Sequence, residues 1–148
     1  PVVRSNEKNL KLLADSWRMA QEIDKAIPVL EQAAKMSKDG DTYVLLGNLY
    51  LFEDRIKDSI RAIEAGLKKP KVKSRSQAQL VLGQAHFELE NFDEAKKQFR
   101  AAARDKDKRI KKTANSWIKY AENEEVRVKN LALRRDFIQQ SQAKEKSS

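Results

Sequence analysis

The residue types that could do chemistry are few in this sequence, and they favour recognition over catalysis. His86 is the only histidine and cysteine is absent, which removes thiolate nucleophiles and thiolate metal sites. The sequence has no glycine-rich phosphate loop, no nucleophile elbow and no histidine–carboxylate metal spacing. Acidic pairs such as Glu53-Asp54 are typical of solvated helix ends. We therefore expect no enzymatic activity, no metal and no cofactor.

Two amide side chains, each followed closely by a phenylalanine, offer a different chemistry. Asn48 precedes Phe52 by four residues and Gln84 precedes Phe87 by three, so each pair shares one side of a helix. An amide can hydrogen-bond an extended peptide backbone while the neighbouring ring takes a peptide side chain. The alternative is that both rings belong partly to the core and that the amides are only solvated. The sequence leaves both interpretations open.

The elements that must position these residues follow a helical repeat. Within 76–104, apolar residues recur at helical spacing on both sides of a short polar break. His86 follows Gly83 by three residues, Ala95 follows it by twelve and Phe99 by sixteen, which resembles the tetratricopeptide signature. A glycine inside a helix costs about 1 kcal/mol relative to alanine. We therefore expect Gly83 to admit a close crossing by the second helix, with the small Ala95 facing it.

Two earlier stretches carry related spacing, so the sequence predicts three helical hairpins. The small residues Ala14, Gly47 and Gly83 lie 33 and 36 residues apart, close to the repeat period of about 34 residues. The predicted fold is all-α, a right-handed α-solenoid of three tetratricopeptide hairpins with a long C-terminal capping helix. The predicted boundaries are a loose lead at 1–5, three units within 6–109 (about 6–39, 40–73 and 76–109), a capping helix at 110–138 and a disordered tail at 139–148.

Stacked hairpins curve, and the first helix of each lines the concave side. On helical spacing, the residues one place after each small residue and four or five places after it point inward. We expect this concave groove to bind a protein or peptide partner. The predicted groove residues are Lys11, Asp15, Arg18, Asn48, Phe52, Gln84, Phe87 and Tyr120.

The net charge of +9 is concentrated in the second half of the chain. Two basic turns between units would lie along the same edge of a stack, so that their fields add. This basic edge comprises Lys69, Lys71, Lys73, Arg75, Lys108, Arg109 and Lys112. The alternative function is an electrostatic adaptor that binds an acidic protein, a membrane surface or nucleic acid through this edge. The competing explanation is solubility together with favourable charge at helix C-termini.

Two of those partner classes are constrained by the sequence. Aromatic residues are not interleaved with the basic ones, which disfavours nucleic acid. No apolar run reaches the roughly 18 to 20 residues that a transmembrane helix needs. A homodimer through the first helix, with Leu13 and Trp17, or through the last helix is also left open.

Several segments resemble a narrower group, the C-terminal region of bacterial tetratricopeptide proteins associated with TonB energy-transduction systems. The resemblance implies a periplasmic helper of TonB-dependent uptake of iron complexes, with a TonB-system component as partner. Because the chain opens at Pro1 rather than at a methionine, we expect it to be a piece of a longer protein. The segments that carry the resemblance are 9–14, 26–36, Tyr43-x-x-Leu-Gly47, Gly66-Leu-Lys68 and Ala114-x-x-Trp-x-x-Tyr120.

Overall fold

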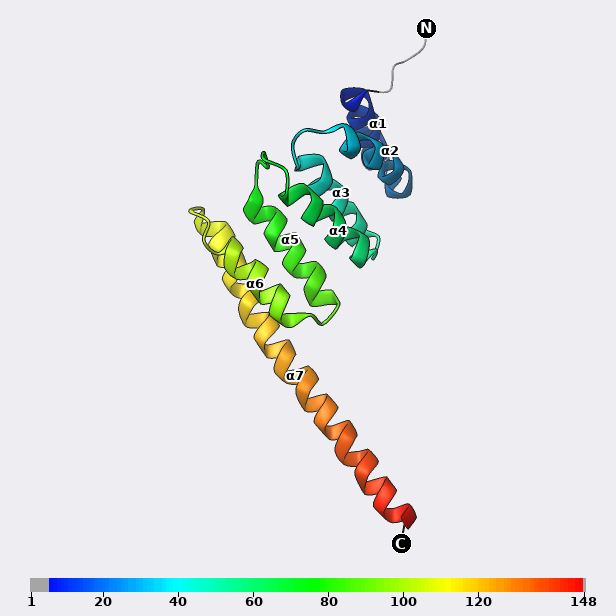
Figure 1. Ribbon diagram of the computed structural model, residues 1–148, viewed down its shortest axis with the longest axis vertical. Coiled ribbons are helices and arrows are strands. Elements are labelled where there is room, and N and C mark those ends of the chain that lie inside the picture. The colour runs from blue at the N-terminus through cyan, green and yellow to red at the C-terminus, as the bar shows by residue number, and fades with distance from the viewer. Residues whose placement is uncertain (1–5, 148) are drawn as a thin grey trace.

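A computed structural model describes residues 6–147, and these residues form seven α-helices (Figure 1). The helices are α1 (Glu7–Met19), α2 (Ile23–Met36), α3 (Asp41–Phe52), α4 (Ile56–Leu67), α5 (Arg75–Glu88), α6 (Phe92–Ala102) and α7 (Lys108–Ser147). The first six pair into three hairpins, and α7 packs mainly on α6. The predicted all-α architecture is confirmed. The predicted lead at 1–5 lies outside the described residues, as does Ser148.

Glycines mark the places where the two helices of a hairpin cross. A Cβ atom at Gly47 would lie 2.3 Å from Cγ1 of Ile63, and one at Gly83 would lie 2.5 Å from Cε1 of Phe99. The absence of a side chain therefore permits the crossing, and the packing offsets the cost of a glycine inside a helix. The ring of Phe99, rather than Ala95, is the group closest to Gly83.

An even closer contact joins the start of α3 to the end of α4. A Cβ atom at Gly40 would lie 2.0 Å from the carbonyl oxygen of Gly66. The backbone N–H of Gly40 donates to the carbonyl of Lys71 at 2.7 Å, and the carboxylate of Asp41 accepts from the N–H of Lys73 at 2.8 Å. These backbone contacts attach the chain after α4 to the turn before α3.

The beginning of α7 occupies the place of a further first helix. Ala78 and Ala85 of α5 are fully buried, and so are Ala114 and Ala121 of α7, which follow them at intervals of 36 residues. On α7 these small residues belong to the same core cluster as α6, which lets α7 cover the end of the stack. Glu125 of α7 also accepts a hydrogen bond from Lys96 of α6 at 2.7 Å.

The Lys96–Glu125 ion pair makes this attachment pH-dependent. The ammonium groups of Lys96 and then Lys129 hold the pKa of Glu125 below its ordinary value. A carboxyl group with a lowered folded-state pKa stabilises the fold above its ordinary pKa, and this contribution is lost as the pH falls through the folded-state value. We expect Glu125→Gln to unfold at a lower temperature than the wild type near pH 7, and the difference to disappear towards about pH 3.

Thermal unfolding followed by circular dichroism across that range measures the difference. Glu122→Gln is the matched control, because Glu122 is exposed on the same helix and forms no ion pair with any described residue. A deficit in Glu125→Gln that stays constant with pH would contradict the role of the ion pair.

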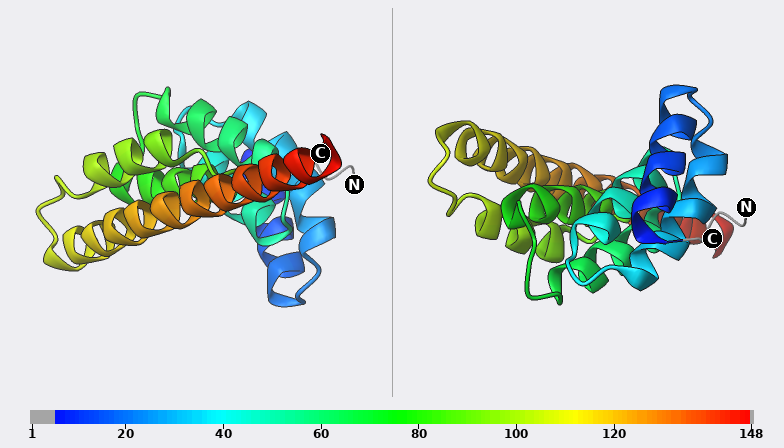
Figure 2. Two further views of the ribbon diagram at one scale, coloured as in Figure 1. Left: turned by 90° about the horizontal axis from the view of Figure 1, so that it is seen from below. Right: turned by 90° about the horizontal axis from the view of Figure 1, so that it is seen from above.

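The last part of α7 projects from the hairpins (Figure 1). The prediction of a helix ending at 138 and a disordered tail at 139–148 is corrected, since α7 continues to Ser147. Residues 139–146 are rich in Gln, Ala, Lys and Glu, which are strong helix formers. Ion pairs one turn apart, such as Arg127–Glu124 at 2.9 Å, support the preceding turns. Both views of Figure 2 show α7 as one unbroken helix.

Candidate functional site

The first helices of the hairpins form one face of the stack. α3 contacts α5 and α5 contacts α7, whereas α2, α4 and α6 make no contacts with one another within residues 6–147. Helices that approach more closely on one side bend the stack towards that side, so α1, α3, α5 and the first turns of α7 line its concave side. We call this surface the inner face.

The predicted groove residues share one register along the inner face. Gln84 follows Asn48 by 36 residues and Tyr120 follows Gln84 by 36, which is also the interval between the buried alanines of α5 and α7. Asp15 precedes Asn48 by 33 residues. The same position in successive first helices is therefore held by Asp15, Asn48, Gln84 and Tyr120, which we call the inner row.

At the N-terminal end of the inner face, charges are already paired within α1. The ammonium of Lys11 lies 2.7 Å from the Glu7 carboxylate, which raises the pKa of Lys11. Arg18 lies 3.0 Å from Asp15. A hollow of about 410 Å³ lies at the far end of the face, and a smaller one of about 190 Å³ lies here. The smaller hollow is lined by Lys11, Asp15, Leu30, Asp41, Thr42 and Leu45.

Phe52 is the exposed aromatic residue in the middle of the predicted set. Its side chain is 76% exposed at the end of α3. The side-chain amide of Asn48, one turn earlier, donates to the carbonyl of Val44 at 3.2 Å, which leaves its oxygen directed to a ligand or water. Gln84 is half-buried on α5. Phe52 and Asn48 therefore fit the prediction of a ring beside a polar amide.

Phe87, which the sequence offers as a second anchor of this kind, is largely engaged within the protein. Its ring stacks on Tyr120 with centroids 5.2 Å apart and meets Trp117 and Phe92 edge-on at 5.7 Å each. Trp117 in turn stacks on Phe99 at 5.3 Å. For Phe87 the interpretation as partly core is the better one, because α7 brings two rings onto it.

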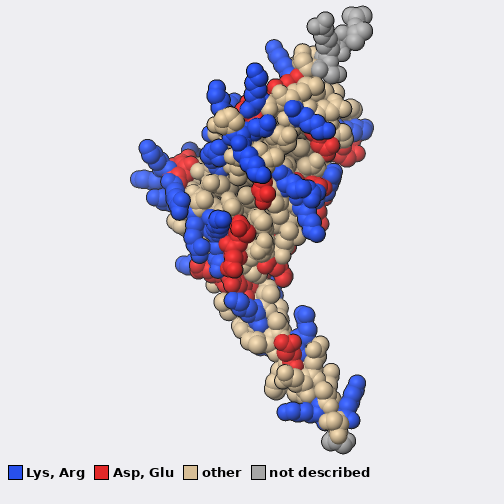
Figure 3. Space-filling view, in the orientation of Figure 1, with Lys and Arg blue, Asp and Glu red and all other residues tan. Residues whose placement is uncertain are grey.

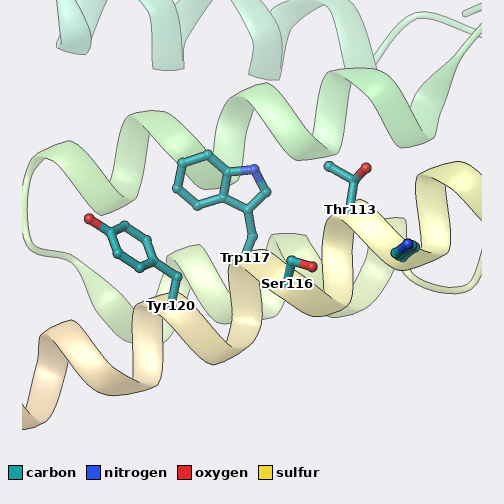
Figure 4. Close-up of a pocket in the computed structure, with 5 residues that line it drawn as sticks. Thr113, Ser116, Trp117 and Tyr120 are labelled. Carbon is teal, nitrogen blue, oxygen red and sulfur yellow. The ribbon is translucent and has the colours of Figure 1, made fainter.

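The larger hollow lies on α7 beside this aromatic cluster. It is lined by Lys112, Thr113, Ser116, Trp117 and Tyr120, and Figure 4 shows the labelled side chains on one side of the helix. We call it the α7 pocket. The predicted set contained Tyr120 and Lys112 but not Trp117 as a wall. The 36-residue interval from Val81 of the inner face to Trp117 could have identified it.

The turns between hairpins lie along one edge of the stack (Figure 1), and Lys and Arg gather over the α4–α5 and α6–α7 turns (Figure 3). Part of this basic edge has a structural role, because Arg75 donates to the carbonyls of Leu67 and Lys69 at 3.1 and 3.2 Å and so ends α4. Lys71 and Lys73 are exposed to solvent.

The remaining basic-edge residues lie at the N-terminus of a helix. Lys108, Arg109 and Lys112 belong to the first turns of α7, where there is no acidic residue in the first turn. Positive charge at this end is unfavourable, because the helix dipole is positive there. The explanation by favourable charge at helix C-termini therefore fails for these three residues, and an anionic partner would relieve the repulsion.

His86 has a packing environment rather than a catalytic one. It is buried, and its Nδ1 lies 3.3 Å from Nδ2 of Asn91 in the turn that follows α5. Within the described residues, histidine and carboxylates form no group of three or more that could hold a metal ion.

Comparison with known proteins agrees with this geometry. Residues 76–104, which hold α5 and α6, match the tetratricopeptide repeat family. The chain is similar to the crystal structure of MamA, with a TM-score of 0.62 and 19% sequence identity over 84% of this chain and 82% of that one. No curated protein matches the sequence. At this level of identity the likeness to MamA concerns the fold alone.

Proposed function

We propose that this chain, an all-α stack with a tetratricopeptide repeat at 76–104, is a non-enzymatic scaffold that binds an extended segment of a partner protein along its inner face. The observation that carries the proposal is the inner row. It passes from the smaller hollow beside Asp15, past the exposed ring of Phe52, to the α7 pocket beside Tyr120.

The inner face combines the two kinds of group that peptide recognition needs. Asn48 and Gln84 present amides that can both donate to and accept from a peptide backbone, which fixes its register. Phe52 and Tyr120 present rings that are 76% and 51% exposed. Aromatic anchors of this kind contribute most of the binding energy in interfaces, while surrounding polar groups confer specificity.

A peptide library tests the proposal without a known partner. We expect peptides selected from a random library displayed on phage to bind the wild type and to bind Phe52→Ala about tenfold more weakly, because that substitution removes an aromatic anchor. Isothermal calorimetry with the selected peptides measures the change.

Phe137→Ala is the matched control, since Phe137 is 70% exposed but lies on the projecting part of α7. Neither substitution removes a buried group, so both variants should remain folded. Equal loss of affinity in the two variants, or none in Phe52→Ala, would rule out the inner face as the binding surface.

An electrostatic adaptor remains the second candidate, because basic residues at the start of α7 lack acidic neighbours in the first turn. Binding through the basic edge alone would fall steeply as the salt concentration rises, whereas contacts to the rings would be less sensitive. No helix within residues 6–147 combines the length and the apolar character of a bilayer-spanning segment.

The TonB association and the periplasmic location rest on the sequence resemblance. We propose them as predictions, with a TonB-system component as the partner. Co-purification of such a component with the tagged protein from a periplasmic fraction tests both, and recovery of the protein from another compartment would contradict the location.

Self-association also stays a prediction. Leu12, Leu13 and Met19 of α1 are exposed, as are Leu133 and Phe137 of α7. Either surface could pair with a second copy, and sedimentation at two protein concentrations distinguishes a dimer from a monomer.

A further inference from the structure

The α7 pocket has walls that the protein itself holds in place. Trp117 is stacked on the fully buried ring of Phe99, with the planes 16° apart. Tyr120 is stacked on Phe87 yet remains 51% exposed. A ligand side chain would therefore meet rings that are already ordered, which reduces the entropy lost on binding. The volume of about 410 Å³ is within the usual range for a pocket that holds a small group.

A second hollow adjoins the pocket and is strongly basic. It has a volume of about 590 Å³ and shares Lys112 and Ser116 with the α7 pocket. One carboxylate, that of Glu122, faces four lysines in its lining. The full lining is Lys108, Lys111, Lys112, Asn115, Ser116, Ile118, Lys119 and Glu122.

These four lysines differ from the basic residues elsewhere on the inner face and on α7. Lys11, Lys96 and Arg127 each lie within 3 Å of a carboxylate. Among the described residues, none of the four lysines of the second hollow forms an ion pair. Their combined field is therefore not cancelled by neighbouring side chains, and it attracts anionic groups to this end of the inner face.

We infer that the α7 pocket and the lysine-lined hollow together recognise an acidic protein segment that carries one large apolar or aromatic side chain. The apolar side chain enters between Trp117 and Tyr120, and carboxylates beside it in the sequence reach the lysines. This inference rests on the proposed function and names the chemistry of the partner at one end of the inner row.

A protein segment fits these observations better than a nucleic acid does. Single-stranded nucleic acids stack successive bases on successive aromatic side chains, whereas here one ring, that of Tyr120, is more than half exposed and its neighbours are packed against each other. The amides of Asn48 and Gln84, earlier in the same row, are suited to a peptide backbone.

Short synthetic peptides test the inference. The probe has one phenylalanine among glutamates, and two further peptides replace either the phenylalanine with alanine or the glutamates with lysines. We expect saturable binding of the acidic phenylalanine peptide, measured by calorimetry on the full chain, and binding about tenfold weaker or less for the other two. Trp17→Phe leaves Trp117 as the only tryptophan, so its fluorescence should change with the same affinity.

Two double variants locate the binding site. Lys111→Ala/Lys112→Ala should weaken the acidic peptide about tenfold and reduce the salt dependence of its binding. Lys144→Ala/Lys146→Ala, which removes the same charge from the far end of α7, should leave the affinity unchanged. Equal effects of the two double variants, or a lysine peptide that binds as well as the acidic one, would overturn the inference.

The outcomes separate this inference from the proposed function. If library peptides depend on Phe52 but the acidic peptide leaves Trp117 unaffected, the inference fails and inner-face binding stands. If no peptide of either kind binds, both fail. A single-stranded oligonucleotide that displaces the acidic peptide and binds more tightly would assign the hollow to nucleic acid and also overturn the inference.

Discussion

Phe99→Ala is expected to lower the free energy of unfolding by about 4 kcal/mol, because it removes a fully buried ring from the centre of a core. The ring fills the space left by Gly83 on one side and stacks on Trp117 on the other. Its loss leaves a cavity between α5 and α6 and removes the surface on which α7 packs. Chemical denaturation followed by circular dichroism measures the change in stability.

The near-ultraviolet circular dichroism of the same variant should lose the signal that ordered aromatic rings give. Phe99→Leu is the control, since leucine keeps most of the apolar volume and should cost clearly less than alanine. If the alanine and leucine variants were equally stable, packing against Gly83 and Trp117 would not account for the stability of this end of the stack.

Gly40→Ala is expected to destabilise the protein by about 3 kcal/mol, at the upper end of the cost of overpacking. The new Cβ would lie 2.0 Å from the carbonyl oxygen of Gly66, which belongs to the backbone of α4. A side chain can rotate away from such a contact, but the backbone of a helix cannot. The start of α3 must therefore move away from the end of α4, and the hydrogen bond from Gly40 to Lys71 is strained as well.

Lys38→Ala is the matched control, because Lys38 is exposed in the same turn and its replacement by alanine removes no described contact. Denaturation midpoints of the two variants and the wild type provide the comparison. A Gly40→Ala protein as stable as the control would show that the turn before α3 can shift freely, in contrast to the close backbone contact described here.

The hairpins could be predicted because the repeat leaves its spacing in the sequence. Gly47 and Gly83 lie inside apolar helices, where only a close crossing offsets their cost, so their positions locate the paired helices. Gly40 gave no such signal, because a glycine in a turn is ordinary. Its contact with Gly66 depends on how two distant backbone segments approach in space.

The candidate site could be predicted in part for a related reason. Helical spacing identified Asn48, Phe52 and Tyr120 as residues of the first-helix surface, since that surface follows from the position of each small residue. The state of Phe87 depends on the rings that α7 supplies, and no repeat signature marks α7. The helical form of 139–147 was missed because polar composition was interpreted as disorder, although the same residues favour helix.

The continuity of α7 has a mechanical consequence. From Lys129 to Ser147 almost every residue is exposed, and these residues extend about 28 Å at about 1.5 Å per residue. The part of the helix that carries Trp117 and the part that projects turn together as a lever, since no break separates them. A tilt of about 10° at the stack would therefore displace the tip by about 5 Å. A small adjustment of the rings is thus amplified at the distant end of the molecule.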